Sequence, residues 1–160
     1  MNKLFISHCA KDQSEVCRLI DLLTVGMGVC KDDIFCTSIN GTLPIGESFS
    51  ENIRKALQES EVVLFFITQN FLESKFCLSE LGAGWGNFKK LIPFIAPPTD
   101  YKALNDTPLQ GVQAIRQDSR LDLIALYSML CNLSIAKTEA SESFYKQLLL
   151  YLKTKDLQEG

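Results

Sequence analysis

The feature that most constrains the fold is an uninterrupted apolar run at residues 62–67 (VVLFFI), within an expected strand at 62–68. The run is far shorter than the roughly 20 residues that a membrane-spanning helix needs. A strand with one face in water would alternate apolar and polar residues, whereas a strand that is apolar throughout is typical of a parallel sheet covered by helices on both faces. The run therefore predicts an α/β domain with this strand at its centre.

Short strand-like runs alternate with longer stretches of helical apolar spacing along the rest of the chain. Five parallel strands that alternate with helices predict a three-layer α/β sandwich, a flavodoxin-like sheet of order 2-1-3-4-5 with helices on both faces. We expect strands at 3–7, 34–36, 62–68, 91–95 and 112–115, and helices at 12–24, 49–60, 119–134 and 141–155, with one more helix after the third strand.

The length of 160 residues fits one hydrophobic core. We expect a single domain over residues 1–160, with a core at 3–136 and a C-terminal amphipathic helix at 141–155. A net charge of −3 without a cluster of basic residues opposes nucleic acid or an anionic membrane as a partner. The sequence shows no secretory signal, so we expect a cytoplasmic location, in which the six cysteines are free thiols. Because there is no C-x-x-C pair and only one histidine, we expect no metal site.

Open α/β sheets bind ligands beyond the carboxyl ends of their strands, at the point where the strand order reverses. Here that point lies between the first and third strands. The chain delivers to it Ser7, His8 and Cys9 after the first strand, residues 37–46 after the second, and residues 70–80 after the third. We expect the functional site among these segments.

Glu80 is the most informative carboxylate in these segments. Its neighbours at helical spacing include no lysine or arginine that could pair with it: they are Phe76, Cys77, Ala83 and Gly84. A carboxylate in such surroundings can line a pocket in which the ligand supplies the partner. Asn70 and Ser74 are candidate helix caps in the same stretch.

Two other chemistries fit the residues poorly. A phosphoacceptor domain of this architecture needs an aspartate at the end of the third strand, where Thr68 stands. A cysteine nucleophile needs a histidine base, and the adjacent residues His8 and Cys9 point to opposite sides of an extended strand. We therefore expect neither activity.

Three segments, in order, resemble a TIR (Toll/interleukin-1 receptor) domain of the prokaryotic NADase type, and the resemblance covers residues 3–115. Residues 4–8 (LFISH) with Asp12 resemble the family's first strand and following loop. Residues 37–46 resemble its BB loop, and residues 71–82 (FLESKFCLSELG) resemble its W-C-x-x-E segment.

The resemblance implies that the protein cleaves NAD at the nicotinamide–ribosyl bond, with Glu80 as the catalytic residue and NAD as substrate rather than cofactor. Nicotinamide is already a cationic leaving group, so a carboxylate that stabilises an oxocarbenium-like ribosyl centre can suffice. The products would be nicotinamide and ADP-ribose or a cyclic ADP-ribose isomer. Phe76 replaces the family's tryptophan and keeps a stacking face without the indole N–H.

The resemblance also implies the residues that would hold the substrate. His8 and Lys11 are the polar candidates for the pyrophosphate, because Cys9 and Ala10 stand where some members carry basic residues. The expected substrate-binding residues are Ser7, His8, Cys9, Lys11, Ser38, Pro44, Gly46, Phe76 and Cys77.

Members of the family often complete the active site with the BB loop of a neighbouring subunit. We therefore expect a homo-oligomer or filament that assembles through residues 37–46, with a regulatory domain or partner chain, as an effector of prokaryotic antiphage immunity. Two alternatives remain open: a non-catalytic TIR scaffold that acts by homotypic association, and a hydrolase similar to nucleoside deoxyribosyltransferases, which can use the same architecture with a catalytic glutamate.

Overall fold

The computed structural model describes residues 3–36, 49–75, 77–78, 81–82 and 90–156. Its centre is a five-stranded sheet in which every pairing is parallel. The strand order β2-β1-β3-β4-β5 confirms the predicted flavodoxin-like topology. The strands are β1 (Leu4–Ser7), β2 (Ile34–Cys36), β3 (Val62–Ile67), β4 (Lys90–Ile95) and β5 (Ile115–Arg116).

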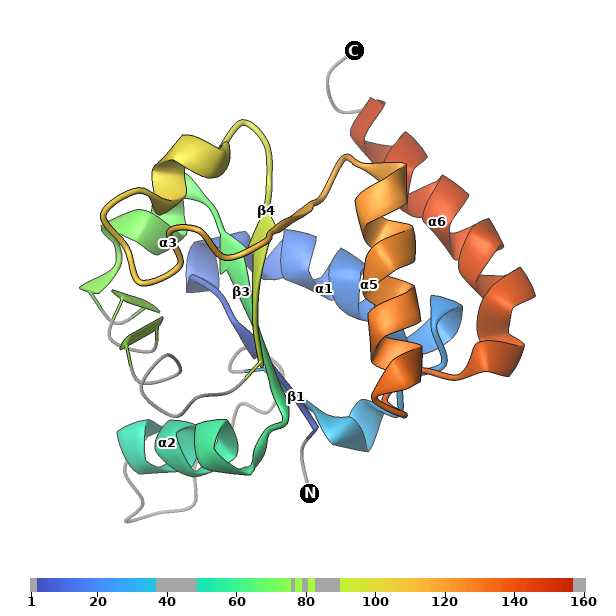
Figure 1. The fold of residues 1–160 in the computed structure, drawn as a ribbon, viewed down its shortest axis with the longest axis horizontal. Coiled ribbons are helices and arrows are strands. Elements are labelled where there is room, and N and C mark those ends of the chain that lie inside the picture. Colours follow the sequence, from blue (N-terminus) through green and yellow to red (C-terminus); the bar gives the residue numbers. More distant parts are fainter. Residues whose placement is uncertain (1–2, 37–48, 76, 79–80, 83–89, 157–160) are drawn as a thin grey trace.

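Helices cover both faces of the sheet, with α1, α5 and α6 on one side and α2 and α3 on the other (Figure 1). The described residues of the stretch 75–82 are also helical. The α-helices are α1 (Gln13–Asp21), α2 (Phe49–Glu59), α3 (Gln69–Glu73), α5 (Arg120–Asn132) and α6 (Ser141–Asp156). The 3₁₀ turns are η1 (Ala10–Asp12), η3 (Lys31–Asp33), η4 (Tyr101–Leu104) and η5 (Thr138–Ala140), and η2 (Leu22–Gly26) is a π-helical turn.

Strand β3 divides its side chains between two hydrophobic cores, which explains why its sequence is apolar throughout. Successive side chains of a strand point to opposite faces, and all six of β3 are 0% exposed. Val62, Leu64 and Phe66 pack in the core beneath α1, α5 and α6. Val63, Phe65 and Ile67 pack in the core that includes the apolar face of α2. The prediction of a central, doubly covered strand is confirmed.

The structure differs from the sequence pattern at the end of the first helix. The predicted helix at 12–24 is α1 followed by the π turn η2, which places Gly26 inside the last turn. Gly26 is buried, and a Cβ atom built on it would lie 3.0 Å from Cβ of Gln147 on α6. The absence of a side chain at Gly26 therefore allows α6 to approach η2 closely.

The fifth strand is shorter and later than predicted. Residues 112–115 carry the apolar pattern, but only Ile115–Arg116 pairs with β4, through the register Phe94↔Ile115. Gly111 has a φ of +81°, and the N–H of Val112 bonds to the carbonyl of Leu109 at 3.0 Å. Because Val112 still belongs to a turn, the chain reaches the sheet edge only at Ile115.

The C-terminal helix α6 buries one face against the core, as its apolar spacing predicts. Phe144, Leu148 and Tyr151 are buried, and the Phe144 ring stacks on Tyr127 of α5 with the ring centroids 4.4 Å apart. None of the helices within the described residues combines the length and apolar character that crossing a bilayer requires.

Candidate functional site

Asp12 joins the segments that follow β1 and β3, at the point where the strand order reverses. Its Oδ2 accepts a hydrogen bond from Thr68 Oγ1 at 2.5 Å, and its Oδ1 accepts one from Asn70 Nδ2 at 3.0 Å. The three residues come from η1, the end of β3 and the first turn of α3. The carboxylate therefore fixes the start of α3 relative to β1.

The cap of α3 is Thr68 rather than the predicted Asn70. The Thr68 oxygen accepts the backbone N–H of Phe71 at 3.0 Å while its hydroxyl proton goes to Asp12. Asn70 lies inside the helix, where its amide reaches Asp12. Thr68 is the N-cap because its backbone is extended, with φ −133° and ψ 172°, as a capping residue requires.

Ser74 caps the next helical segment, as predicted. The chain leaves α3 with Ser74 extended, and Ser74 Oγ accepts the N–H of Cys77 at 3.2 Å. Cys77 and Leu81 are each 2% exposed and belong to the core on the α2 side, whereas Leu78 is 40% exposed. This alternation is that of a helix with one face on the sheet. Phe76 and Glu80 lie outside the described residues.

His8 is a buried residue of the β1 end, 4% exposed. Its Nδ1 lies 3.6 Å from Cys36 Sγ at the end of the adjacent strand β2. The thiol that contacts His8 is therefore that of Cys36, from a different strand, and not that of Cys9, its neighbour in the sequence. Burial lowers the pKa of His8, and the backbone of Ile6 and the Asp12 carboxylate only partly oppose this effect. The imidazole is therefore neutral at pH 7, and Nε2 has no hydrogen-bond partner among the described residues.

The remaining predicted site residues differ in their access to solvent. Ser7 is fully buried, Cys9 is half-buried against the core on the α2 side, and Lys11 is exposed. The structure thus brings Ser7, His8 and Cys9 together at the carboxyl edge of the sheet and leaves Lys11 at the surface. The candidates Ser38, Pro44 and Gly46 of the predicted BB loop lie outside the described residues.

A second polar group on the same edge of the sheet has no signal in the local sequence. Glu15 of α1, Gln117 after β5 and Tyr151 of α6 meet through side-chain hydrogen bonds, with Gln117 Nε2 3.2 Å from Glu15 Oε2 and 2.8 Å from the Tyr151 hydroxyl. These residues come from three separate elements, so no motif spacing connects them. Among the described residues, no group of three His, Cys, Asp or Glu side chains could hold a metal ion.

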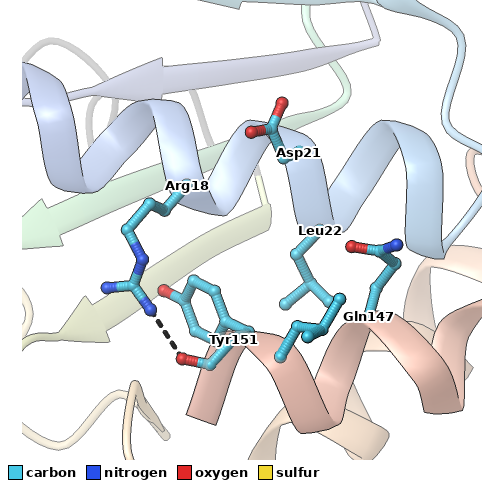
Figure 2. Close-up of a pocket in the computed structure, with 6 residues that line it drawn as sticks. Arg18, Asp21, Leu22, Gln147 and Tyr151 are labelled. Atoms are coloured by element: carbon cyan, nitrogen blue, oxygen red, sulfur yellow. Dashed lines mark hydrogen bonds between the residues drawn. The ribbon is translucent and has the colours of Figure 1, made fainter. Parts of the chain in front are cut away.

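Arg18 lines a small cavity of about 130 Å³ between α1 and α6 (Figure 2), and its guanidinium is already engaged by neighbouring groups. The guanidinium donates to the backbone oxygen of Tyr151 at 2.5 Å and to Glu15 Oε2 at 2.8 Å. Its Cζ also lies 4.8 Å from the centroid of the Tyr151 ring. Because the Arg18 guanidinium is paired with Glu15 and the Tyr151 carbonyl, we interpret Arg18 as a structural link between α1 and α6 and not as a binding site for an anion.

An open parallel sheet of order 2-1-3-4-5, with polar residues gathered where β1 and β3 end, defines a flavodoxin-like α/β domain. Within that class, the family model described as TIR domain matches residues 4–125. The chain belongs to the TIR domain family.

One curated relative is the uncharacterized protein YddK of Bacillus subtilis (strain 168), which is 36% identical over 97 residues. The match covers 59% of this chain and 36% of the relative, so the chain spans about a third of that protein's length.

Solved structures share the fold at low sequence identity. The TIR domain of the Toll-related receptor TRR-2 from Hydra magnipapillata has a TM-score of 0.61 and 17% identity, covering 84% of this chain and 98% of that one. The TIR domains of the activated Roq1 resistosome, which recognises the pathogen effector XopQ, have a TM-score of 0.55 and 16% identity, with 96% and 84% covered. The CMP N-glycosidase BcmB from Clostridium botulinum has a TM-score of 0.50 and 13% identity, with 80% and 99% covered.

Proposed function

We propose that the protein is an NAD glycohydrolase of the TIR family, with Glu80 as its catalytic carboxylate. The observation that carries the proposal is the anchoring of the segment around Glu80. Thr68 caps α3, Ser74 caps the following helical segment, and Cys77 and Leu81 are buried on either side of Glu80 in the sequence. The segment begins beside the end of β1, where open α/β sheets bind their ligands.

The reaction needs little from the protein besides a positioned negative charge. The bond between ribosyl C1′ and the pyridinium nitrogen breaks, and its electron pair neutralises the ring nitrogen, so neutral nicotinamide leaves without a general acid. The positive charge develops on the ribosyl centre, which the Glu80 carboxylate would stabilise. Attack by water then gives ADP-ribose and a proton, and attack by the adenine gives a cyclic isomer.

Substrate contacts follow from the same assignment. Phe76 would stack on a planar ring of NAD, and exposed Lys11 would meet the pyrophosphate. Because the His8 imidazole is neutral, it would contribute a hydrogen bond rather than a positive charge.

We further propose that activity requires self-association through residues 37–46, with Ser38, Pro44 and Gly46 of one subunit facing the site of the next. The resistosome among the structural neighbours, which recognises a pathogen effector, supports both an assembled state and a role in immunity. For this chain the role would be that of an NAD-consuming effector in prokaryotic antiphage defence, under the control of a regulatory domain or a partner chain.

The proposal is tested by incubating the protein with NAD over a series of protein concentrations and measuring nicotinamide release by chromatography. Glu80→Gln keeps the size of the side chain and removes its charge, and we expect the rate to fall by roughly 10²-fold or more. Glu142→Gln is the matched control, because Glu142 lies exposed on α6 with a side-chain exposure of 89%. Equal rates for Glu80→Gln and wild type would exclude Glu80 as the catalytic residue.

A second candidate function is hydrolysis of an N-glycosidic bond in a nucleotide or nucleoside, which the fold shared with the CMP N-glycosidase favours. Both reactions break a bond between a ribosyl carbon and a ring nitrogen, so the same assay separates them when CMP and free nucleosides replace NAD. Release of base from these compounds, with NAD left intact, would establish the second function. Inertness toward all of them in an assembled sample would leave the scaffold role.

A further inference from the structure

The C-terminal helix α6 presents apolar side chains to solvent as well as to the core. It is the outermost helix on its side of the sheet (Figure 1), and it packs against η2 and α5. Tyr145 and Leu149, one turn apart, are 47% and 52% exposed, although the adjacent residues Phe144 and Leu148 are buried. A single exposed apolar residue is ordinary, but two in successive turns form a stripe that a partner can cover. The outer side of α6 is therefore a candidate contact surface.

Four exposed side chains lie on one line along the outer side of α6: Glu142, Lys146, Leu149 and Lys153. They are separated by four, three and four residues, which is the spacing of a coiled-coil seam. Tyr145 lies beside this seam, one turn before Leu149. The seam thus begins with an acid, ends with a base and has an apolar contact between them. A helix with that order of side chains can pack its outer side against a second helix.

The charges of the seam are complementary to those of a second copy of the same helix that runs antiparallel. When Glu142 lies opposite Lys153 of the second copy, symmetry repeats this pair at the other end of the contact. The same register places Lys146 opposite Leu149, where the methylene stem of the lysine can cover the leucine. A parallel pair would set each charge against its like, and an antiparallel register shifted by four residues toward the C-terminus would set Lys146 opposite Lys153. Charge therefore selects one direction and one register.

Within each subunit the acid of the seam is only weakly engaged. Glu142 pairs with Lys146 at 3.9 Å, and the two side chains are 89% and 75% exposed. Such a surface pair contributes little to stability. Glu142 can therefore turn to a lysine of a second copy at small cost.

We propose that the outer side of α6 is a self-association surface, on which a second copy of this chain docks its own α6 antiparallel. The helix follows residues 4–125, which match the family model, so the surface is a feature of the C-terminal part of this chain. Because each subunit contributes one helix face, the contact is small, and we expect a Kd between about 10 µM and 1 mM. This surface goes beyond the proposed NAD cleavage and self-association through residues 37–46, and it depends on neither.

The mass of the protein in solution tests the proposal, measured by sedimentation over a concentration series that spans this range. Wild type is expected to form a dimer. Glu142→Lys and Lys153→Glu each set like charges against one another at both ends of the contact, and each should raise the Kd of the dimer by roughly tenfold or more. Asp32→Lys, at an exposed position on η3, makes the same change of charge outside α6 and should keep the wild-type Kd.

Mixing the two α6 variants gives the sharper test. In a mixed dimer of Glu142→Lys with Lys153→Glu, both facing pairs again join opposite charges. An equimolar mixture should therefore associate with about the wild-type Kd, although neither variant does so alone, and the double variant should also recover the dimer. This recovery would not occur if the single variants were merely misfolded.

Three results would overturn the proposal. A dimer whose Kd is unchanged in both single variants would assign self-association to another surface. A mixture that stays monomeric would exclude the antiparallel register. A wild type that is monomeric throughout, yet sediments with vesicles of phosphatidylglycerol and phosphatidylcholine, would assign the lysines and Leu149 to a lipid surface instead. The proposed NAD cleavage is judged separately, because mass and not nicotinamide release is measured.

Discussion

Thr68 and Asp12, 56 residues apart in the sequence, share a hydrogen bond of 2.5 Å between a hydroxyl and a carboxylate. The same Thr68 oxygen caps α3 by accepting from Phe71 N. The Thr68 side chain thus connects the segment after β1 to the segment after β3. It also starts α3, the helix that precedes the segment containing Glu80 in the sequence. Its removal should affect both stability and the proposed site.

Thr68→Val keeps the shape of the side chain and deletes its hydroxyl. We expect the free energy of unfolding to fall by about 2–4 kcal/mol, since a helix cap contributes about 1 kcal/mol and a hydrogen bond to a charged group about 1.5–3 kcal/mol. Thr24→Val is the matched control, because Thr24 Oγ1 of η2 donates to the Ile20 carbonyl one helical turn earlier, at 2.9 Å, and this bond is local in the sequence. Urea denaturation measures both, and equal losses would contradict a special role for Thr68.

His8 should make the stability depend on pH between neutrality and mild acid. Its folded-state pKa lies below the ordinary value of 6.5 because of burial, so below about pH 6.5 the unfolded chain binds a proton that the folded protein does not. Stability from this residue is therefore complete above that pH and is lost as the pH falls toward the folded pKa. Measured from pH 7 to pH 5, the loss of unfolding free energy should be smaller in His8→Gln than in wild type.

NMR titration gives a direct check, because His8 is the only histidine in the chain. The imidazole resonances should titrate below pH 6.5. A midpoint at or above that value would contradict a neutral, buried His8 and would restore it as a cationic contact for the pyrophosphate.

The sheet could be predicted from the sequence because a strand that is buried on both faces has a continuous run of apolar residues. Residues 62–67 are apolar at both phases of the strand, and each phase enters a different core. Helical spacing in 141–155 likewise matches the buried face of α6. The position of β5 could not be predicted, since Val112 and Ile115 are equally apolar and the turn at Gly111 decides which of them joins the sheet.

The candidate site was predicted only where chain order alone brings residues together. Ser7 ends β1 and His8 and Cys9 follow it, so the topology places them at the carboxyl edge of the sheet. Contacts such as Asp12 with Thr68, or Glu15 with Gln117, join elements that are distant in sequence, and neither spacing nor residue type indicates which acceptor each donor selects.

Two glycines test the packing of helical segments from opposite sides. Gly26→Ala is expected to destabilise the protein by about 1–3 kcal/mol, because the new Cβ would lie 3.0 Å from Gln147 and 3.3 Å from Leu22. Gly82→Ala is the control: in the part of the chain that the structure describes, no atom outside its own helix and chain neighbours lies within 4 Å of its added Cβ, and alanine favours a helix over glycine by up to about 1 kcal/mol. Thermal unfolding should show opposite signs for the two, and a stabilising Gly26→Ala would contradict the close approach of α6.

Arg18 should hold α6 against α1 through its contacts with Tyr151, one of which is the hydrogen bond drawn in Figure 2. Arg18→Met keeps most of the apolar stem but loses the bonds to the Tyr151 carbonyl and Glu15 and the contact with the Tyr151 ring. We expect a loss of about 2–4 kcal/mol in unfolding free energy, since Glu15, with a side-chain exposure of 29%, would keep its charge without its partner.

Lys146→Met is the control, because the pair of Lys146 with Glu142 is 3.9 Å apart and largely exposed, so its loss should cost under about 0.5 kcal/mol. Amide hydrogen exchange should be faster along α6 in Arg18→Met alone, and uniform exchange in both variants would show that apolar packing suffices to hold the helix.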